Sequence, residues 1–160
     1  MHLPGHRQVT VTNAPASSVL RDMEDRCRTH DRDRFPLGRH PVPCVLIVED
    51  DADIRDFMQF LLSASGYETM TAANGQEALH LMRERRPCMV LLDLMMPVMD
   101  GFDFRARQLQ EPTLAPVPVL CLTAMFDAAY VTERLAVPCL NKPVSVDRLL
   151  MEVEERCHPE

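Results

Sequence analysis

The chain is 160 residues long, which suits one domain with a short extension. Its 46% hydrophobic residues can fill a core, and its 26% charged residues suit a soluble surface. The net charge of −7 is uneven: residues 1–43 carry +2, from seven Arg and five acids, and the rest carries −9. This acidic remainder argues against direct DNA binding. With no secretory signal or membrane-spanning apolar run, we expect a cytoplasmic protein without membrane insertion.

Residues 1–43 show no sustained hydrophobic period and contain five Pro and four of the six His. Ser17 to His30 has three apolar residues at helical spacing, but an isolated short helix is marginal in water. We therefore expect a disordered N-terminal extension. The four His have no partners at metal-ligand spacing.

The six cysteines form no Cys-x-x-Cys pair, and four of them lie at or inside apolar runs. Their positions are Cys27, Cys44, Cys88, Cys121, Cys139 and Cys157. In a cytoplasmic protein this pattern favours reduced, buried thiols over disulfides or a zinc site.

From Cys44 onward, apolar runs typical of strands alternate with stretches of helical period. The strands are predicted at 45–48, 67–72, 88–92, 117–122 and 137–140. The helices are predicted at 53–65, after Asn74 to about residue 86, at 101–110, at 127–135 and after Ser145. Five such alternations predict an α/β fold with a parallel sheet covered by helices on both faces. We expect the flavodoxin-like doubly wound order 2-1-3-4-5.

Carboxylates follow two of the predicted strands. Glu49 and Asp50 end the first strand, and Asp93 ends the third. In the expected order these strands are neighbours, so the three carboxylates would share one crevice. Three carboxylates so close together repel one another unless a cation is bound. Mg²⁺ (or Mn²⁺) is the hard divalent metal that takes such ligands. Asp51 next to them suits a helix N-cap instead.

The last two strands lead into Thr123 and Lys142. A hydroxyl, an ammonium group and a metal together are the groups that hold phosphoryl oxygens. Asp93 is the carboxylate best placed to act as nucleophile in aspartyl-phosphate chemistry.

Residues 44–157 resemble a response-regulator receiver domain of two-component signalling. The stretches that carry the resemblance are Val45-Leu46-Ile47-Val48-Glu49-Asp50-Asp51, Asp93-Leu94-Met95-Met96-Pro97-Val98-Met99-Asp100-Gly101, Leu122-Thr123-Ala124 and Asn141-Lys142-Pro143. They are spread in order over nearly the whole domain.

The resemblance implies a role for each matching residue. Asp93 would accept a phosphoryl group from a phosphohistidine donor, a histidine kinase or a histidine phosphotransfer protein. Asp50, Asp93 and the backbone carbonyl of Met95 would ligate Mg²⁺, with Glu49 acting through metal-bound water. Thr123 and Lys142 would contact the phosphoryl oxygens and move toward them. This would switch a surface around the last two helices and the last strand.

Two features depart from the family pattern. Cys139 stands where many receivers have an aromatic switch residue, and the segment from Thr123 to Lys142 is short, so its helix should be abbreviated. We expect no output domain, so that the signal passes by protein contacts or onward phosphotransfer. The protein would then be mainly a switch with self-catalysed phosphotransfer and autodephosphorylation.

A phosphorylation-independent adaptor with the same fold is the alternative. A phosphohydrolase of the haloacid-dehalogenase type is disfavoured, because Met95 stands where that family needs a second Asp. Met95 and Met125 lie two residues after Asp93 and Thr123, where receivers vary the speed of dephosphorylation. We expect two apolar side chains there to position water poorly and to make the acyl phosphate long-lived.

Overall fold

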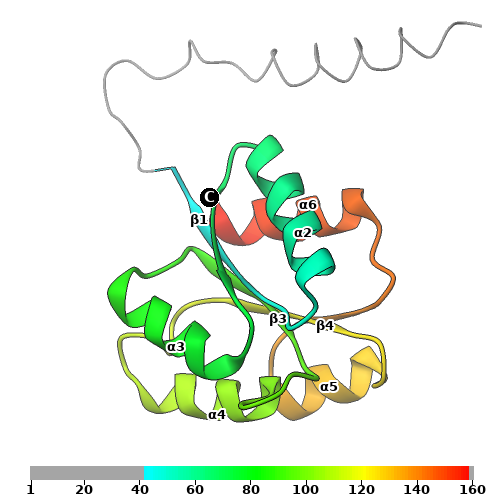
Figure 1. Ribbon diagram of the computed structural model, residues 1–160. Coiled ribbons are helices and arrows are strands. Elements are labelled where there is room, and N and C mark those ends of the chain that lie inside the picture. The colour runs from blue at the N-terminus through cyan, green and yellow to red at the C-terminus, as the bar shows by residue number, and fades with distance from the viewer. Residues whose placement is uncertain (1–41, 159–160) are drawn as a thin grey trace, which may run out of the picture. The chain divides into compact units, whose positions relative to one another are not determined.

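The structure is a computed structural model that describes residues 42–158 (Figure 1). Of the predicted extension, residues 1–43, only Val42 and Pro43 fall within this range. Its expected disorder, and the helical spacing of residues 17–30, therefore lie outside the described residues. Five strands alternate with five helices. In chain order they are β1 Cys44–Val48, α2 Ala52–Ala64, β2 Glu68–Ala72, α3 Gly75–Glu84, β3 Met89–Asp93, α4 Gly101–Gln110, β4 Val119–Thr123, α5 Ala128–Leu135, β5 Cys139–Asn141 and α6 Val146–Cys157.

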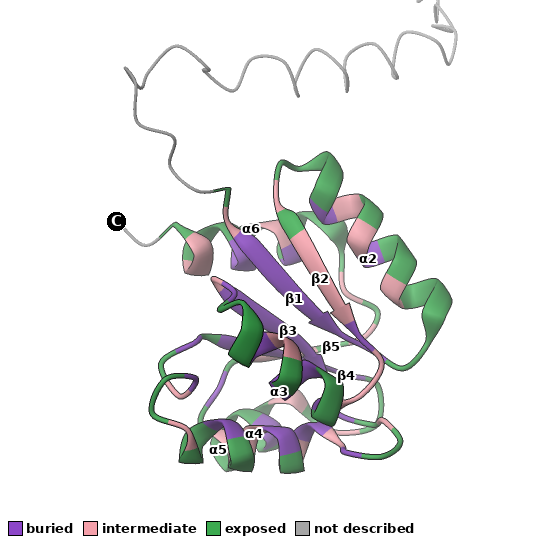
Figure 2. Cartoon of the chain, turned by 60° about the vertical axis from the view of Figure 1, so that its left-hand side comes forward, coloured by how far each residue is buried: buried purple, intermediate pink, exposed green. Residues whose placement is uncertain are grey.

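The strands form one parallel sheet in the order β2-β1-β3-β4-β5. The predicted flavodoxin-like fold is therefore confirmed. The central strands β1, β3 and β4 are buried along their whole length, as their apolar sequences predict (Figure 2). Their carboxyl ends meet at one edge of the sheet, where Asp93 on β3 pairs in register with Leu122 on β4.

Two helical layers cover the sheet (Figure 1). On one face α3, α4 and α5 pack through side chains such as Leu79, Phe104 and Val131. On the other face α2 and α6 pack through side chains such as Leu62 and Val153. The predicted abbreviated helix is present as α5, which has eight residues. Within residues 42–158, no helix has both the length and the apolar character needed to cross a membrane.

Proline sets the start of the last two strands. β4 begins at Val119 and β5 at Cys139, each two residues later than predicted. Pro118 and Pro138 precede them and lack an N–H for the ladder. Their carbonyl groups still accept, from the N–H groups of Val90 and Cys121 respectively.

The α2 helix begins with the cap that its sequence predicts. Asp51 Oδ1 accepts from the backbone N–H groups of Asp53 and Ile54, at 2.9 and 3.1 Å. Only part of the apolar stripe of α2 reaches the core: Met58 and Leu62 are buried, whereas Phe57 is 57% exposed.

The expectation that the cysteines are reduced is wrong for two of them. Cys88 and Cys157 form a disulfide, 69 residues apart in sequence. The pairing has no local sequence signal, because it arises only when α6 runs back across the sheet to the start of β3. Cys44 and Cys121 are free and buried, as predicted, and Cys139 is free and half-buried. Cys27 lies outside the described residues.

Candidate functional site

The three carboxylates predicted to share a crevice do come together. Glu49 and Asp50 follow β1, and Asp93 is the last residue of β3. One carboxylate oxygen from each lies within 4.8 Å of the others. Glu49 is 2% exposed and Asp93 8% exposed, whereas Asp50 faces solvent. The cluster is thus open on one side, where a ligand can approach.

Lys142 is the cation that faces this cluster. It follows β5 directly, and its Nζ donates to Glu49 Oε2 at 2.7 Å and to Asp93 Oδ1 at 3.2 Å. It is also the only lysine in the chain, since every other basic residue is Arg or His. One ammonium group therefore contacts two of the three carboxylates but offers only one positive charge, so the site stays net negative.

Burial and charge shift the acid–base properties of this pair. Burial raises the pKa of the Glu49 carboxyl above its usual range; the Lys142 hydrogen bond opposes this shift and the Asp93 charge adds to it. For Lys142, burial alone would lower the pKa. The hydrogen bond to Glu49 and the charges of Asp93 and Glu49 outweigh burial and raise the pKa. The ammonium form is thereby favoured at the site.

Thr123 ends β4 and is 1% exposed. Its Oγ1 accepts from the backbone N–H of Phe126 at 3.1 Å. A hydroxyl that accepts in this way keeps its own proton free to donate. The Thr123 carbonyl accepts from the Lys142 N–H at 2.7 Å, so the hydroxyl-bearing and ammonium-bearing strand ends are directly linked.

Two residues that support the cluster were not identified from the sequence. Arg55 on α2 reaches back, and its Nη1 donates to the carbonyls of Glu49 at 2.7 Å and Asp50 at 3.3 Å. Gly101 begins α4 so close to β3 that a Cβ there would lie 2.8 Å from the carbonyl oxygen of Asp93. Gly101 ends one of the stretches that carry the family resemblance, whereas nothing in the local sequence marks Arg55.

A methionine follows each of the strands β3 and β4. Met95 lies two residues beyond β3 and is 48% exposed, and Met125 lies two residues beyond β4 and is 72% exposed. Both residues are therefore accessible to solvent. Use of the Met95 backbone carbonyl as a metal ligand stays a prediction.

Known proteins are similar in sequence to part of this chain. The polar-differentiation response regulator DivK of Brucella anthropi is 33% identical over 113 residues, which cover 69% of this chain and 92% of that protein. The probable transcriptional regulator ycf27 of Porphyra purpurea is 41% identical over 81 residues, 51% of this chain and 32% of the regulator. This chain thus matches about a third of the length of that regulator.

Solved structures share the fold. The chemotaxis protein CheY4 of Vibrio cholerae is 30% identical with a TM-score of 0.66, over 72% of this chain and 98% of that one. A putative response regulator from Chloroflexus aurantiacus is 28% identical with a TM-score of 0.67, over the same shares. Residues 45–154 match the family described as the response regulator receiver domain. The chain belongs to the response regulator receiver domain family.

Proposed function

We propose that Asp93 accepts a phosphoryl group from a phosphohistidine donor in a Mg²⁺-dependent reaction. The observation that carries this proposal is the meeting of Glu49, Asp50 and Asp93 with Lys142 at the carboxyl edge of the sheet. Asp93 is the member of the cluster placed on a strand end and contacted by the ammonium group.

The residues fit a hard divalent cation. The three carboxylates supply oxygen ligands within 4.8 Å of one another, and one lysine leaves negative charge uncompensated. Asp50, which is exposed, and Asp93 would hold the ion, and Glu49 would contact its water. When bound, Mg²⁺ would reduce the repulsion between the carboxylates and an incoming phosphoryl group.

Three side chains of the protein then have separate roles in phosphoryl transfer. The Asp93 carboxylate attacks the phosphorus of the phosphohistidine donor; the P–N bond breaks, and the donor's imidazole leaves with a proton from solvent. The Lys142 ammonium group offsets negative charge on the phosphoryl oxygens. The Thr123 hydroxyl donates a hydrogen bond to one of those oxygens. Because its Oγ1 also accepts a hydrogen bond from the Phe126 N–H, movement of Thr123 would displace the loop before α5.

We further propose that the protein is cytoplasmic and is phosphorylated by a histidine kinase or a histidine phosphotransfer protein. The phosphorylated form would change protein contacts or pass the phosphoryl group onward. Residues 44–157 would form the receiver domain that does this. The adaptor alternative has no specific observation in its favour, because the carboxylates, Lys142 and Thr123 are all present at the site.

The metal requirement tests this proposal. Wild-type protein is incubated with acetyl phosphate, either with Mg²⁺ or with the metal chelated, and the phosphoryl adduct is quantified by intact mass. We expect the adduct only with Mg²⁺, and a higher Mg²⁺ requirement for Asp50→Asn. An adduct that forms equally well in chelator would contradict the metal's role.

Met95→Asn is expected to shorten the lifetime of the phosphoryl group by about fivefold to tenfold, because an amide can hydrogen-bond an attacking water and a thioether cannot. The measurement is phosphate loss from the phosphorylated protein with Mg²⁺ present. Met151→Asn is the matched control, since Met151 is 61% exposed on α6, a helix that carries none of the proposed site residues. Slower phosphate loss in Met95→Asn would overturn the expectation.

A further inference from the structure

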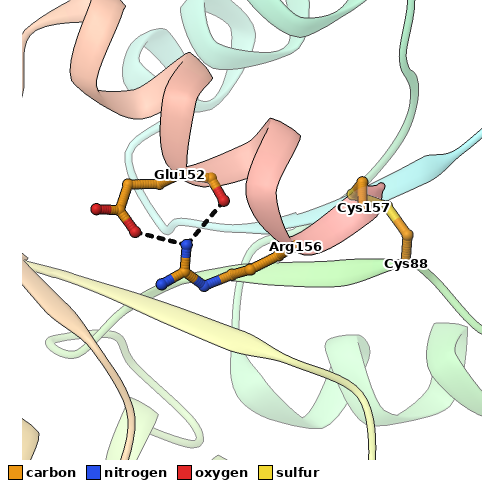
Figure 3. The surroundings of a disulfide bond; sticks show 4 residues. All are labelled: Cys88, Glu152, Arg156 and Cys157. Carbon is orange, nitrogen blue, oxygen red and sulfur yellow. Dashed lines mark hydrogen bonds and ion pairs between the residues drawn. A yellow bond between two sulfur atoms is a disulfide. The ribbon is translucent and has the colours of Figure 1, made fainter. Parts of the chain in front are cut away.

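The disulfide joins two edges of the domain that are far apart in sequence (Figure 3). Cys88 stands directly before β3, and Cys157 is the last residue of α6. Their Cα atoms lie 5.1 Å apart. The bond therefore attaches the end of α6 to the amino-terminal edge of the sheet.

This position separates the disulfide from the phosphoryl site. Cys88 and Asp93 lie at opposite ends of β3, and five residues of strand span about 16 Å. α6 likewise runs from near Lys142 to Cys157, and its twelve residues span about 18 Å. The disulfide thus acts on the far end of α6 and not on the groups around Asp93.

The other attachments of α6 lie before its last turn. Leu149 and Val153 are the apolar residues of α6 buried against the sheet, at 5% and 0% exposure. Glu152 pairs with Arg148 and Arg156, each at 2.5 Å, but these ion pairs connect residues of the same helix. Figure 3 shows the pair with Arg156. Both ion pairs stiffen α6 without attaching it to the sheet.

Among the described residues beyond Val153, the mostly buried side chain of Arg156 and one aromatic pair add to the disulfide. The rings of Tyr67 and His158 lie with their centroids 6.0 Å apart. Such a pair is worth far less than a covalent bond. The bond between Cys88 and Cys157 is therefore the strongest single attachment of residues 154–158 to the sheet.

We propose that Cys88 and Cys157 form a reversible thiol–disulfide site that couples redox state to the docking of the last turn of α6. Both residues are half-buried, unlike the fully buried Cys44 and Cys121, so a small reductant can reach them. The inference rests on the proposed cytoplasmic signalling role, because cytoplasmic disulfides are usually transient, catalytic or redox-sensing.

The reaction is a thiol–disulfide exchange with a soluble dithiol. The dithiol's thiolate attacks one sulfur of the protein disulfide, and its second thiol resolves the mixed disulfide. The protein gains two electrons and two protons as two thiols, and the dithiol becomes its own cyclic disulfide. A small-molecule disulfide such as oxidised glutathione reverses the process.

Hydrogen exchange of the full chain tests the proposal. The protein is oxidised with oxidised glutathione or reduced with dithiothreitol, and disulfide-linked peptides are mapped by mass spectrometry. We expect a linked Cys88–Cys157 peptide only in the oxidised form. In the reduced form, amides of residues 154–158 should exchange at least about tenfold faster, while those around Val153 should change little.

Two variants serve as controls. Cys157→Ser should exchange at the fast rate with or without dithiothreitol, and Cys139→Ser should keep the full redox response. Equal exchange in the oxidised and reduced wild type, or a disulfide that dithiothreitol leaves intact, would overturn the proposal. So would loss of the response in Cys139→Ser, since another pair would then be responsible.

A separate measurement distinguishes failure of this proposal from failure of the proposed function. The redox response should persist in Asp93→Asn, which cannot accept a phosphoryl group under the proposed function. Phosphorylation of the wild type by acetyl phosphate should differ by less than about twofold between the two redox states, because the sites are distant. A redox response that requires Asp93 would contradict an independent site.

Discussion

Lys142→Met is expected to lower the free energy of unfolding by about 2–4 kcal/mol in the absence of Mg²⁺. The substitution keeps much of the apolar stem but removes the ammonium group that contacts Glu49 at 2.7 Å and Asp93 at 3.2 Å. Both carboxylates are nearly buried, so neither can regain full hydration. We place the loss below that of a fully buried pair because the Lys142 side chain is 20% exposed.

Urea unfolding with and without Mg²⁺ measures this effect. Added Mg²⁺ should recover part of the loss, since a divalent cation supplies the positive charge that three carboxylates then lack. Arg83→Met is the control, because it removes an exposed ion pair with Glu111 and should cost much less. A Lys142→Met protein as stable as Arg83→Met would show that the ammonium group does not stabilise the cluster.

Gly101→Ala is expected to destabilise the protein by about 1–3 kcal/mol and to slow phosphorylation of Asp93 about tenfold or more. A Cβ at position 101 would lie 2.8 Å from the Asp93 carbonyl oxygen and 2.9 Å from the Leu94 Cα. These are backbone atoms, so the contact can be relieved only by moving the end of β3 away from α4. That movement would misplace the Asp93 carboxylate relative to Lys142.

Gly66→Ala separates the two effects. Gly66 has a φ of +91°, which disfavours Ala, but a Cβ there would meet nothing within 4 Å. It should therefore lose stability while keeping the wild-type rate of phosphorylation by acetyl phosphate. If Gly101→Ala also keeps the wild-type rate, close packing of α4 against β3 is not what positions Asp93.

The sheet could be predicted from the sequence because its central strands are short apolar runs that end in polar residues. The runs before Glu49 and Asp93 are buried in full, and the alternation with helices left few topologies. Once the order was set, the meeting of the three carboxylates followed, because the carboxyl ends of parallel strands lie at one edge. This part of the site depends on backbone topology alone.

The remaining features depend on packing between distant segments. Arg55 reaches the carbonyls of Glu49 and Asp50 only because α2 folds back over the end of β1. The bond between Cys88 and Cys157 forms only because the last helix returns to the start of β3. Neither pairing has a local spacing that sequence periodicity could reveal.

The helical spacing of apolar residues also did not predict how exposed each apolar side chain is. Phe57 and Leu62 both lie on apolar positions of α2, yet Phe57 is 57% exposed and Leu62 fully buried. A helical period identifies a stripe but does not fix how much of it the sheet covers. That depends on the angle at which α2 crosses β1 and β2.

The central claim is that Asp93 is the phosphoryl acceptor, and intact mass after incubation with acetyl phosphate and Mg²⁺ tests it most directly. Wild-type protein is compared with Asp93→Asn and with Asp100→Asn, whose side chain can still cap α4. We predict one phosphoryl adduct in the wild type and in Asp100→Asn, and none in Asp93→Asn. Acetylation of Lys142 would give a different mass and is not counted. An unmodified wild type, or a phosphoryl adduct that survives Asp93→Asn, would contradict the claim.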